Sequence, residues 1–466
     1  MKDRRRQAGI GLLVAIFCPA GGATGNALGA ASDSPPNVLF VVADDLGWSD
    51  VGWHGGFAHT PHMDRLVATG VELDRHYVQP VCTPTRTALM TGRYPGRFGP
   101  QAIKPSNLRA FQPGTPTLAA AFRSLGYRTS QSGKWHLGSM PEWGPIAHGF
   151  DHGYGTLTGA ADPWTHKYRR GPYEDTWHRD GRPVPEEENA TELVAAEAVR
   201  RIREGAGSGR PWFVYVPFHA VHTPVDAPER YKRLYEGVTF HEDHERDDSR
   251  RRLAAMVSQL DAEIGEMVSA IDESGERDET LIVFTSDNGG IESLRNAYVS
   301  DVSDSPLNSD NRPLRGQKNS LYEGGVRVCA FANWPGTLEP RRCQSPMHVA
   351  DWFPTLAGLV GYNPPADAAW DGVDRWRAVL GPEDLPRGKP IVIVHQSGRA
   401  VIDGALKLIQ RHRGKPKLFD LSDDPFESRD LADERTEDVE RLQAIARADK
   451  ALDLVELPDD LRGLPP

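Results

Sequence analysis

Two short polar clusters follow directly after apolar runs that read as buried strands. Their members are three carboxylates and one amide: Asp44, Asp45, Asp287 and Asn288. Carboxylate and amide oxygens form a hard ligand set, which suits Ca²⁺ or Mg²⁺ rather than zinc. Asp-Asp and Asp-Asn pairs are also common in turns and helix caps, so each pair alone is weak evidence. Together, at the ends of two strands, they predict a metal site.

The segment from Cys82 to Arg93 places a cysteine, a proline and two arginines at short spacing. It reads Cys82-Thr-Pro-Thr-Arg86 and continues as Leu89-Met-Thr-Gly-Arg93. The first half alone is a pattern of moderate specificity. With the second half at this spacing, a structural coincidence is a poor explanation.

Three further loops carry cationic or titratable side chains beside turns or strand ends. The candidates are Lys134, His136, His222 and Lys318. A single lysine or histidine in such a loop is most often solvated or packed, so the prediction depends on their occurring together. A set of fixed cations with a metal can neutralise an anionic ester and stabilise the charge that develops in its transition state.

The stretch from Cys82 to Arg93 resembles the signature of the type I sulfatase family. Within that family, Asp44–Gly52 and Ser320–Arg327 are most similar to the arylsulfatase B group, the N-acetylgalactosamine-4-sulfatases. Lys417–Pro425 resembles a feature of the family's C-terminal domain. The resemblance spans most of the chain, over residues 44–99, 133–155, 218–224, 281–290 and 314–335.

The resemblance implies two cofactors. A separate formylglycine-generating enzyme would oxidise Cys82 to formylglycine, whose hydrated form supplies the nucleophile. Calcium, with magnesium as the other option, would be bound by the modified Cys82 and the four polar residues: Asp44, Asp45, Asp287 and Asn288. Arg86 would steady the formylglycine.

The resemblance also implies roles in sulfate ester cleavage. Lys134, His136, His222 and Lys318 would surround the sulfate. One diol hydroxyl would attack sulfur while Asp287 accepts its proton, and His222 or Lys318 would protonate the departing alcohol. His136 would then take the proton of the second hydroxyl and expel sulfate, so replacing His136 is expected to trap the covalent sulfo-enzyme.

Sugar contacts are expected in the segment 155–166, which is only loosely similar to the arylsulfatase B group. The candidates there are Asp162, Trp164 and His166. A surface loop without a binding role explains this segment equally well.

The order of apolar runs predicts an α/β fold. The expected buried strands are Asn37–Ala43, Trp212–Pro217 and Leu281–Thr285, and the expected helices are Thr117–Leu125 and Arg251–Ile271. Short buried strands separated by helices are typical of a mainly parallel sheet between helical layers, here alkaline-phosphatase-like by resemblance. Ligands of such sheets bind beyond the carboxyl ends of the strands, where the acidic clusters lie.

The tail changes to short, closely spaced apolar runs. The runs near 390–395, 400–404, 407–409 and 417–421 predict a small antiparallel sheet, and 434–451 predicts a polar helix. We therefore expect three parts: a signal peptide over residues 1–30, a catalytic domain over 31–375 and a small α+β subdomain over 376–466.

The N-terminus has the pattern of a secretory signal. Arg4, Arg5 and Arg6 precede the short apolar run Ile10–Phe17, and small residues follow. The protein is expected to be exported, as a periplasmic or secreted enzyme, and no other run is apolar enough to span a membrane. In an oxidising compartment Cys329 and Cys343 could form a disulfide, and two free buried thiols are an equal alternative.

Bulk charge limits the partners. The 466-residue chain has a formal net charge of −11, so nucleic acid is not expected as a partner and an anionic substrate needs a local basic pocket. The expected substrate is a sulfated carbohydrate or an aryl sulfate. The alternatives are a formylglycine-dependent phosphodiester or phosphonate hydrolase and a catalytically silent sulfated-glycan binding protein. A zinc phosphatase fits badly, because it needs a Ser or Thr nucleophile and more histidine ligands.

Overall fold

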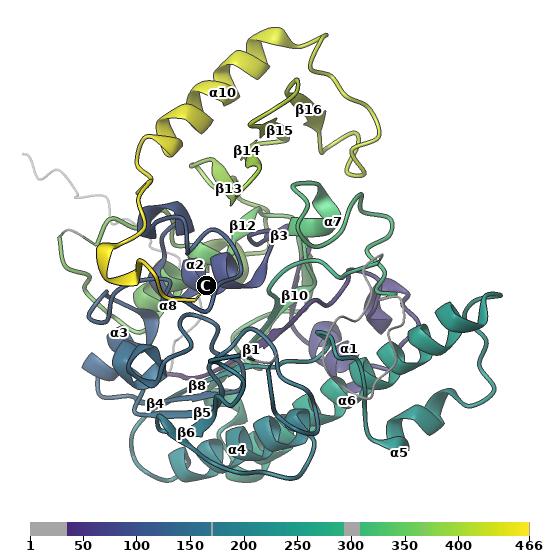
Figure 1. Cartoon of the computed structure of the whole chain (residues 1–466), viewed down its shortest axis with the longest axis vertical. Helices are drawn as coiled ribbons and strands as arrows, with labels where there is room; N and C mark the ends of the chain where they lie inside the picture. The colour runs from purple at the N-terminus through teal and green to yellow at the C-terminus, as the bar shows by residue number, and fades with distance from the viewer. Residues whose placement is uncertain (1–34, 169–170, 293–307, 367, 466) are drawn as a thin grey trace, which may run out of the picture.

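A ten-stranded, mostly parallel sheet forms the centre of the protein (Figure 1). The computed structural model describes residues 35–168, 171–292, 308–366 and 368–465, so the expected signal peptide lies outside the described residues. The strands run in the spatial order β11 (Arg341–Cys343), β2 (Val71–Leu73), β10 (Ala330–Asn333), β9 (Thr280–Ser286), β1 (Asn37–Ala43), β8 (Trp212–Pro217), β4 (Arg128–Ser132), β5 (His152–Thr156), β6 (Trp177–Arg179) and β7 (Arg182–Pro183).

Strands β1, β8 and β9 are mainly apolar because helices cover both faces of the sheet. Every residue of β1 is buried, and its side chains alternate between two hydrophobic clusters. One cluster packs β1 against α1 (Pro61–Ala68), α4 (Ala190–Gly205) and α6 (His244–Ser274). The other packs it against α2 (Cys82–Thr91), α3 (Leu118–Ser124) and α8 (Trp352–Leu359), as Figure 1 shows. The predicted α/β fold class is confirmed.

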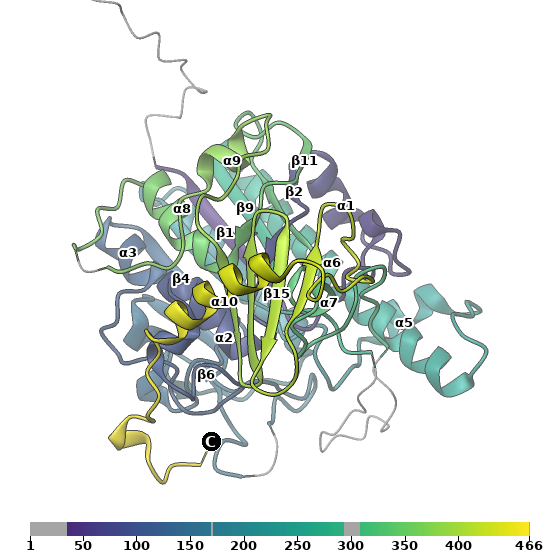
Figure 2. The same cartoon turned by 90° about the horizontal axis from the view of Figure 1, so that it is seen from above.

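A four-stranded antiparallel sheet follows, made of β13 (Ile391–His395), β14 (Gly398–Asp403), β15 (Leu406–Arg411) and β16 (Lys417–Asp420). Helix α10 (Thr436–Lys450) lies across this sheet in Figure 2, and Val392 and Val394 of β13 belong to the apolar cluster that it completes. Ile391 and Ile393 face the other way and pack with Tyr77 of the main body. The predicted C-terminal sheet and helix are therefore present, while a domain boundary near residue 375 stays a prediction.

The remaining strands and α-helices are short. They are β3 (His76–Tyr77), which pairs with β12 (Met347–His348), and the helices α5 (Glu229–Lys232), α7 (Glu323–Val326) and α9 (Trp376–Leu380). None of the helices among the described residues is long and apolar enough to cross a membrane.

Helix α6 begins seven residues before the predicted start at Arg251. The Asp243 side chain accepts the backbone N–H of Arg246 and caps the helix. Arg251 pairs with Asp247 one turn earlier, and Arg252 with Asp248 in the same way. These polar turns have no apolar periodicity, so hydrophobic spacing could not predict them.

The disulfide alternative for Cys329 and Cys343 is wrong, because both thiols are free and buried. Cys329 packs in the cluster on one face of the sheet and Cys343 in the cluster on the other face. The sheet separates the two sulfurs, which closeness in sequence does not reveal.

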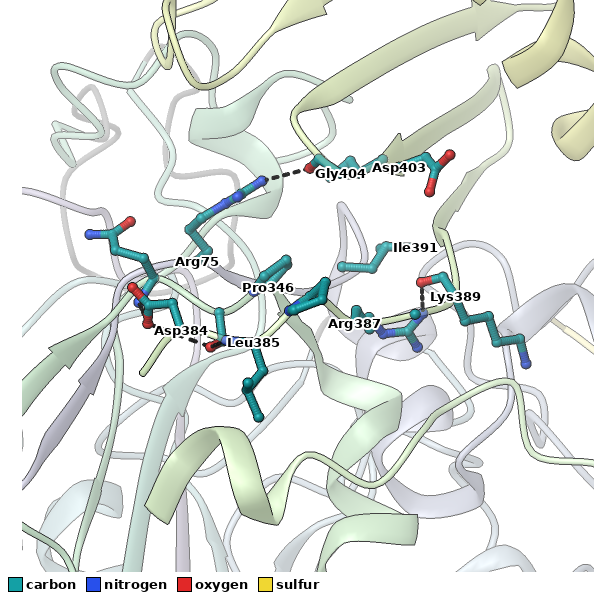
Figure 3. A pocket seen from close by; sticks show the side chains of 14 residues that line it. Arg75, Pro346, Asp384, Leu385, Arg387, Lys389, Ile391, Asp403 and Gly404 are labelled. Atoms are coloured by element: carbon teal, nitrogen blue, oxygen red, sulfur yellow. Dashed lines mark hydrogen bonds between the residues drawn. The ribbon is translucent and has the colours of Figure 1, made fainter. Parts of the chain in front are cut away.

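A cavity of about 530 Å³ lies between the small sheet and the main body (Figure 3). Arg75 donates to the Gly404 carbonyl across it at 3.2 Å. Arg387, which also lines the cavity, forms an ion pair with Asp351. Ile391 and Ile402 of the small sheet contribute to its lining. None of the predicted site residues lines this cavity, so it is a feature of the junction between the two sheets.

Candidate active site

The carboxyl ends of β1 and β9 bring the two acidic clusters together. These strands are parallel neighbours with Ala43 opposite Ser286, so Asp44 and Asp287 leave the sheet side by side. The Asp287 N–H donates to the Ala43 carbonyl at 3.0 Å. Asp45 turns back through a left-handed backbone conformation with φ of 64°. All four metal candidates are buried at this edge.

Helix α2 places Cys82 against these carboxylates. One ligand atom each from Cys82, Asp44 and Asp287 lie within 4.8 Å of one another. Cys82 is the first residue of α2, which is buried along its whole length. Burial raises the pKa of the Cys82 thiol, and the cations Lys134 and Lys318 only partly offset this effect. Because the thiol is held neutral, an unmodified Cys82 would be a weak nucleophile.

Arg86 lies one helical turn after Cys82 and so on the same face of α2. Its Nε and Nη2 both donate to Oδ2 of Asp287, at 3.0 and 2.8 Å, and its Nη1 donates to the Lys134 carbonyl at 2.9 Å. The guanidinium thus joins the nucleophile helix, the β9 cluster and the Lys134 loop. Arg86 is 1% exposed, so all three contacts are shielded from water.

Two lysines and a histidine complete the charged centre. Lys134 Nζ pairs with Asp44, and Lys318 Nζ pairs with Asp45. His222 Nε2 lies 3.6 Å from Asp45 Oδ2, while its Nδ1 contacts the Thr223 carbonyl at 2.6 Å. Since a carbonyl only accepts, Nδ1 carries the proton and donates, which leaves Nε2 facing the acidic centre.

In this centre, burial and the neighbouring opposite charges shift the pKa values of the site residues in opposite directions. Burial raises the pKa of Asp45, but Lys318 and His222 outweigh it and hold the pKa below its ordinary value. Burial and the Asp44 carboxylate raise the pKa of Asp287, against the pull of Arg86. Burial lowers the pKa of His222, and Asp45 opposes that change.

The residues at the strand ends fit a hard cation. Asp44 Oδ1, Asp45 Oδ2 and Asn288 Oδ1 are buried and accept no hydrogen bond from any described residue. Buried oxygens without partners are costly, and three of them from neighbouring residues are the ligand set of a hard divalent ion. A divalent ion bound by these oxygens would remove this cost, so the predicted metal site is consistent with the structure.

His136 reaches the centre from the loop that begins at Gly133. Backbone hydrogen bonds hold this loop on the ends of β8 and β5, with Lys134 N–H donating to the Pro217 carbonyl at 2.7 Å. The His136 backbone is left-handed, with φ of 55°, and Nδ1 has no hydrogen-bond partner among the described residues. Burial lowers the pKa of His136 well below its ordinary value, with help from Lys134, so the ring is neutral.

Gly159 makes room for the His136 ring, so Gly159→Ala should disturb it directly. A Cβ at position 159 would lie 2.3 Å from His136 Nε2, although the backbone there needs no glycine-specific φ. We expect kcat to fall about 100-fold, the effect that a shift of about 1 Å in a reacting group can have. Steady-state kinetics on any accepted sulfate ester measures it. Gly358→Ala, whose new Cβ would meet only the Asp374 carboxylate, is the control and should keep its kcat; equal rates for the two variants would contradict the steric prediction.

The sugar-contact candidates lie in one loop beside the centre. Asp162 Oδ1 accepts the backbone N–H of Trp164 and Thr165, so this carboxylate shapes the loop. Trp164 is 39% exposed and donates from Nε1 to Asp226. His166 is buried, contacts the Glu188 carbonyl at 2.8 Å and packs on Trp177. Trp164 alone presents a large surface to solvent, and sugar binding by all three stays a prediction.

The sequence assigned no role to His219, which the structure places beside the centre. It is 4% exposed, stacks on Trp177, and neither ring nitrogen has a hydrogen-bond partner among the described residues. Burial lowers its pKa well below the ordinary value, with a contribution from Lys134. Its position three residues before the predicted site residue His222 was the only sequence signal.

The fold and site define an α/β protein with a buried centre in which carboxylates are paired with lysine and arginine side chains. Comparisons identify its family. The Sulfatase family matches residues 36–362, and the chain belongs to that family. It is therefore a sulfuric ester hydrolase, and the mechanism of its family depends on formylglycine and a bound metal. The predicted sulfatase resemblance is confirmed, while the likeness to the arylsulfatase B group in particular stays a prediction.

Several relatives cover much of the chain. It is 31% identical to bovine arylsulfatase A over 93% of this chain and 90% of that protein, and 32% identical to dog N-acetylgalactosamine-6-sulfatase over 76% and 68%. It is 34% identical to mouse arylsulfatase J, of whose length it spans 57%. Among solved structures it resembles Ps i-CgsB in complex with k-i-k-neocarrahexaose, with a TM-score of 0.81 and 27% identity over 90% of this chain and 94% of that one.

Proposed function

We propose that this sulfatase removes sulfate from a sulfated carbohydrate, using formylglycine made from Cys82 and a bound calcium ion. The observation that carries the proposal is the convergence of Cys82, paired lysines and three unpartnered oxygens at the ends of β1 and β9. The carbohydrate follows from the relatives, among them an N-acetylgalactosamine-6-sulfatase and a structure bound to a neocarrahexaose. We further propose that residues 1–30 direct export to the periplasm or the exterior and that a formylglycine-generating enzyme acts on the chain.

The chain's own residues would divide the work as follows. When bound, calcium held by Asp44, Asp45, Asp287, Asn288 and residue 82 supplies positive charge opposite the sulfate oxygens. Formylglycine at position 82 supplies the nucleophilic oxygen. Lys134 and Lys318 would bind the sulfate once it takes the place of the carboxylate oxygens that they now contact.

Two histidines are suited to opposite proton transfers. His222 holds its Nδ1 proton on the Thr223 carbonyl and turns Nε2 toward the centre. It would act as the imidazolium, which the neighbouring Asp45 and Asp44 carboxylates favour, and would give its second proton, on Nε2, to the departing alcohol. His136 is neutral and buried, so it can accept a proton when sulfate is released. Arg86 holds the Asp287 carboxylate in place throughout.

Calcium should stabilise the purified protein against heat. A ligand at 100 times its Kd adds about 2.7 kcal/mol to the free energy of unfolding, which gives a readout that does not depend on activity. Asp45→Asn removes one ligand charge and should raise the calcium concentration needed for half of the shift by roughly 10-fold or more. Asp433→Asn, a 92% exposed carboxylate, should titrate like the unaltered protein. If magnesium raised the unfolding temperature more than calcium did, magnesium would be the preferred ion. No change in unfolding temperature with either ion would contradict the metal site.

Free sulfate released from a panel of sulfated mono- and oligosaccharides tests the substrate class. The protein is produced together with a formylglycine-generating enzyme, and conversion at position 82 is confirmed by mass spectrometry. We expect release from at least one sugar. Release only from an aryl sulfate would contradict the carbohydrate substrate, and faster cleavage of an aryl phosphodiester would favour the phosphodiesterase alternative. Binding of a sulfated glycan without release would favour a silent binding protein.

A further inference from the structure

Strand β13 of the small sheet contacts the segment that leads into Cys82. Gln79, three residues before Cys82, is fully buried. Its Oε1 accepts the Val394 N–H at 2.7 Å, and its Nε2 donates to the Val392 carbonyl at 3.4 Å. The side chain thus binds the backbone of β13 as a further strand would, and it fixes the approach to the nucleophile helix.

The same strand contacts the loop that carries Lys318. His395, the last residue of β13, has Nε2 2.7 Å from Oδ1 of Asn319, the residue after Lys318. The Ser397 N–H donates to Nδ1 of His395 at 3.2 Å, so Nδ1 is the acceptor and Nε2 carries the proton. Nε2 therefore donates to Asn319. Burial lowers the pKa of His395 to about 4, which keeps this neutral form near pH 7.

Asn319 links the contact with His395 to the segment that leads into Cys82. Its backbone is left-handed, with φ of 69°, and its N–H donates to the Pro80 carbonyl at 2.8 Å. Pro80 lies between Gln79 and Cys82 in the sequence. A chain of hydrogen bonds therefore runs from His395 through Asn319 to the Cys82 segment, and back to β13 through Gln79.

We propose that β13 is a positioning strand for catalysis, in which His395, acting through Asn319, fixes Lys318 relative to Cys82. The inference rests on the proposed roles of Cys82 and Lys318. His395 touches neither the nucleophile segment nor Lys318 directly, so it is a positioning residue.

Apolar packing alone does not explain this arrangement. Ile391 and Ile393 of β13 attach the small sheet to the body, but Ile391 also lines the 530 Å³ cavity, so the packing below the strand is incomplete (Figure 3). Apolar contacts have no direction, whereas hydrogen bonds from His395 and Gln79 specify distance and angle. Buried polar pairs add little net stability, so their main effect is on geometry.

Kinetics of four variants test the inference, with formylglycine content measured in each so that failed maturation is recognised. We expect His395→Ala to lower kcat about 10- to 100-fold with KM changed less than about twofold, because a small misplacement of reacting groups has effects of that size. His395→Gln keeps an N–H donor near the place of Nε2 and should recover most of the activity. Asn319→Gly keeps the left-handed backbone without the side chain and should match His395→Ala. His412→Ala, on the exposed end of the small sheet, is the control and should keep its kcat.

Amide hydrogen exchange provides a readout independent of catalysis. His395→Ala should speed exchange in peptides covering residues 316–322 and 79–83 by about 10-fold or more, with other segments unchanged. If the unaltered protein cleaves no sulfate ester, the proposed function fails and the exchange result alone decides whether β13 holds these segments. Unchanged exchange overturns the inference, and so does a kcat for His395→Ala equal to that of His412→Ala. A rate for His395→Gln as low as for His395→Ala overturns the role of the hydrogen bond.

Discussion

Cys82→Ala should fold, bind calcium and release sulfate at least roughly 10⁴-fold more slowly than the formylglycine-bearing protein, because the nucleophilic oxygen is lost. The substitution removes one buried sulfur at the start of α2, whose side chain caps nothing. The charged centre around it stays paired through Lys134, Lys318 and Arg86. Sulfate release by the two proteins, each with its fold verified by thermal unfolding, measures the effect.

Cys343→Ala is the matched control for this prediction. Cys343 is also a free, buried thiol, but it packs in the hydrophobic cluster between the sheet and helices α2, α3 and α8. Its loss should change stability by no more than a small buried side chain does and leave turnover intact. Comparable sulfate release by Cys82→Ala and Cys343→Ala would show that position 82 is not the nucleophile.

The sequence predicts those parts of the architecture that depend on local patterns, and it misses contacts between residues far apart in the chain. The strand at Asn37–Ala43 was predicted with the observed ends, because burial on both faces requires an unbroken apolar run. Asp44 and Asp287 were predicted to meet because parallel neighbours end at one edge of a sheet. Both inferences need only local patterns and one rule of topology.

Contacts that depend on tertiary placement left no such pattern. Gly159 needs to be glycine because His136 lies over it, and no turn signal marks this requirement. His395 meets Asn319 across 76 positions of sequence, at the junction of two sheets. His219 lies three residues before the predicted site residue His222, but the sequence cannot show that its ring nitrogens have no hydrogen-bond partner among the described residues. The sequence thus predicted the charged and metal-binding candidates of the site, and it missed Gly159, His395 and Asn319, which contact them or position them.

Arg86→Ala should lower the free energy of unfolding by about 3–5 kcal/mol, since it leaves the buried Asp287 carboxylate without its partner. Asp287 is fully buried and receives two hydrogen bonds from this guanidinium. The same change releases the Lys134 carbonyl, so kcat/KM should also fall by roughly 10³-fold, as when a preorganised donor is removed. Chemical denaturation in the absence of metal measures the stability, and sulfate release measures the activity.

Arg86→Lys and Arg441→Ala separate the causes of that loss. A lysine ammonium restores positive charge beside Asp287 but cannot reproduce the planar fork that reaches both Asp287 and the Lys134 carbonyl. We therefore expect Arg86→Lys to regain part of the stability and little of the activity. Arg441 pairs with Asp403 at the surface, where the two side chains are 46% and 35% exposed, and its removal should cost less than about 1 kcal/mol. Equal stability of Arg86→Ala and Arg441→Ala would contradict this prediction. It would mean that Asp287 is protonated in the folded protein and does not need the Arg86 charge.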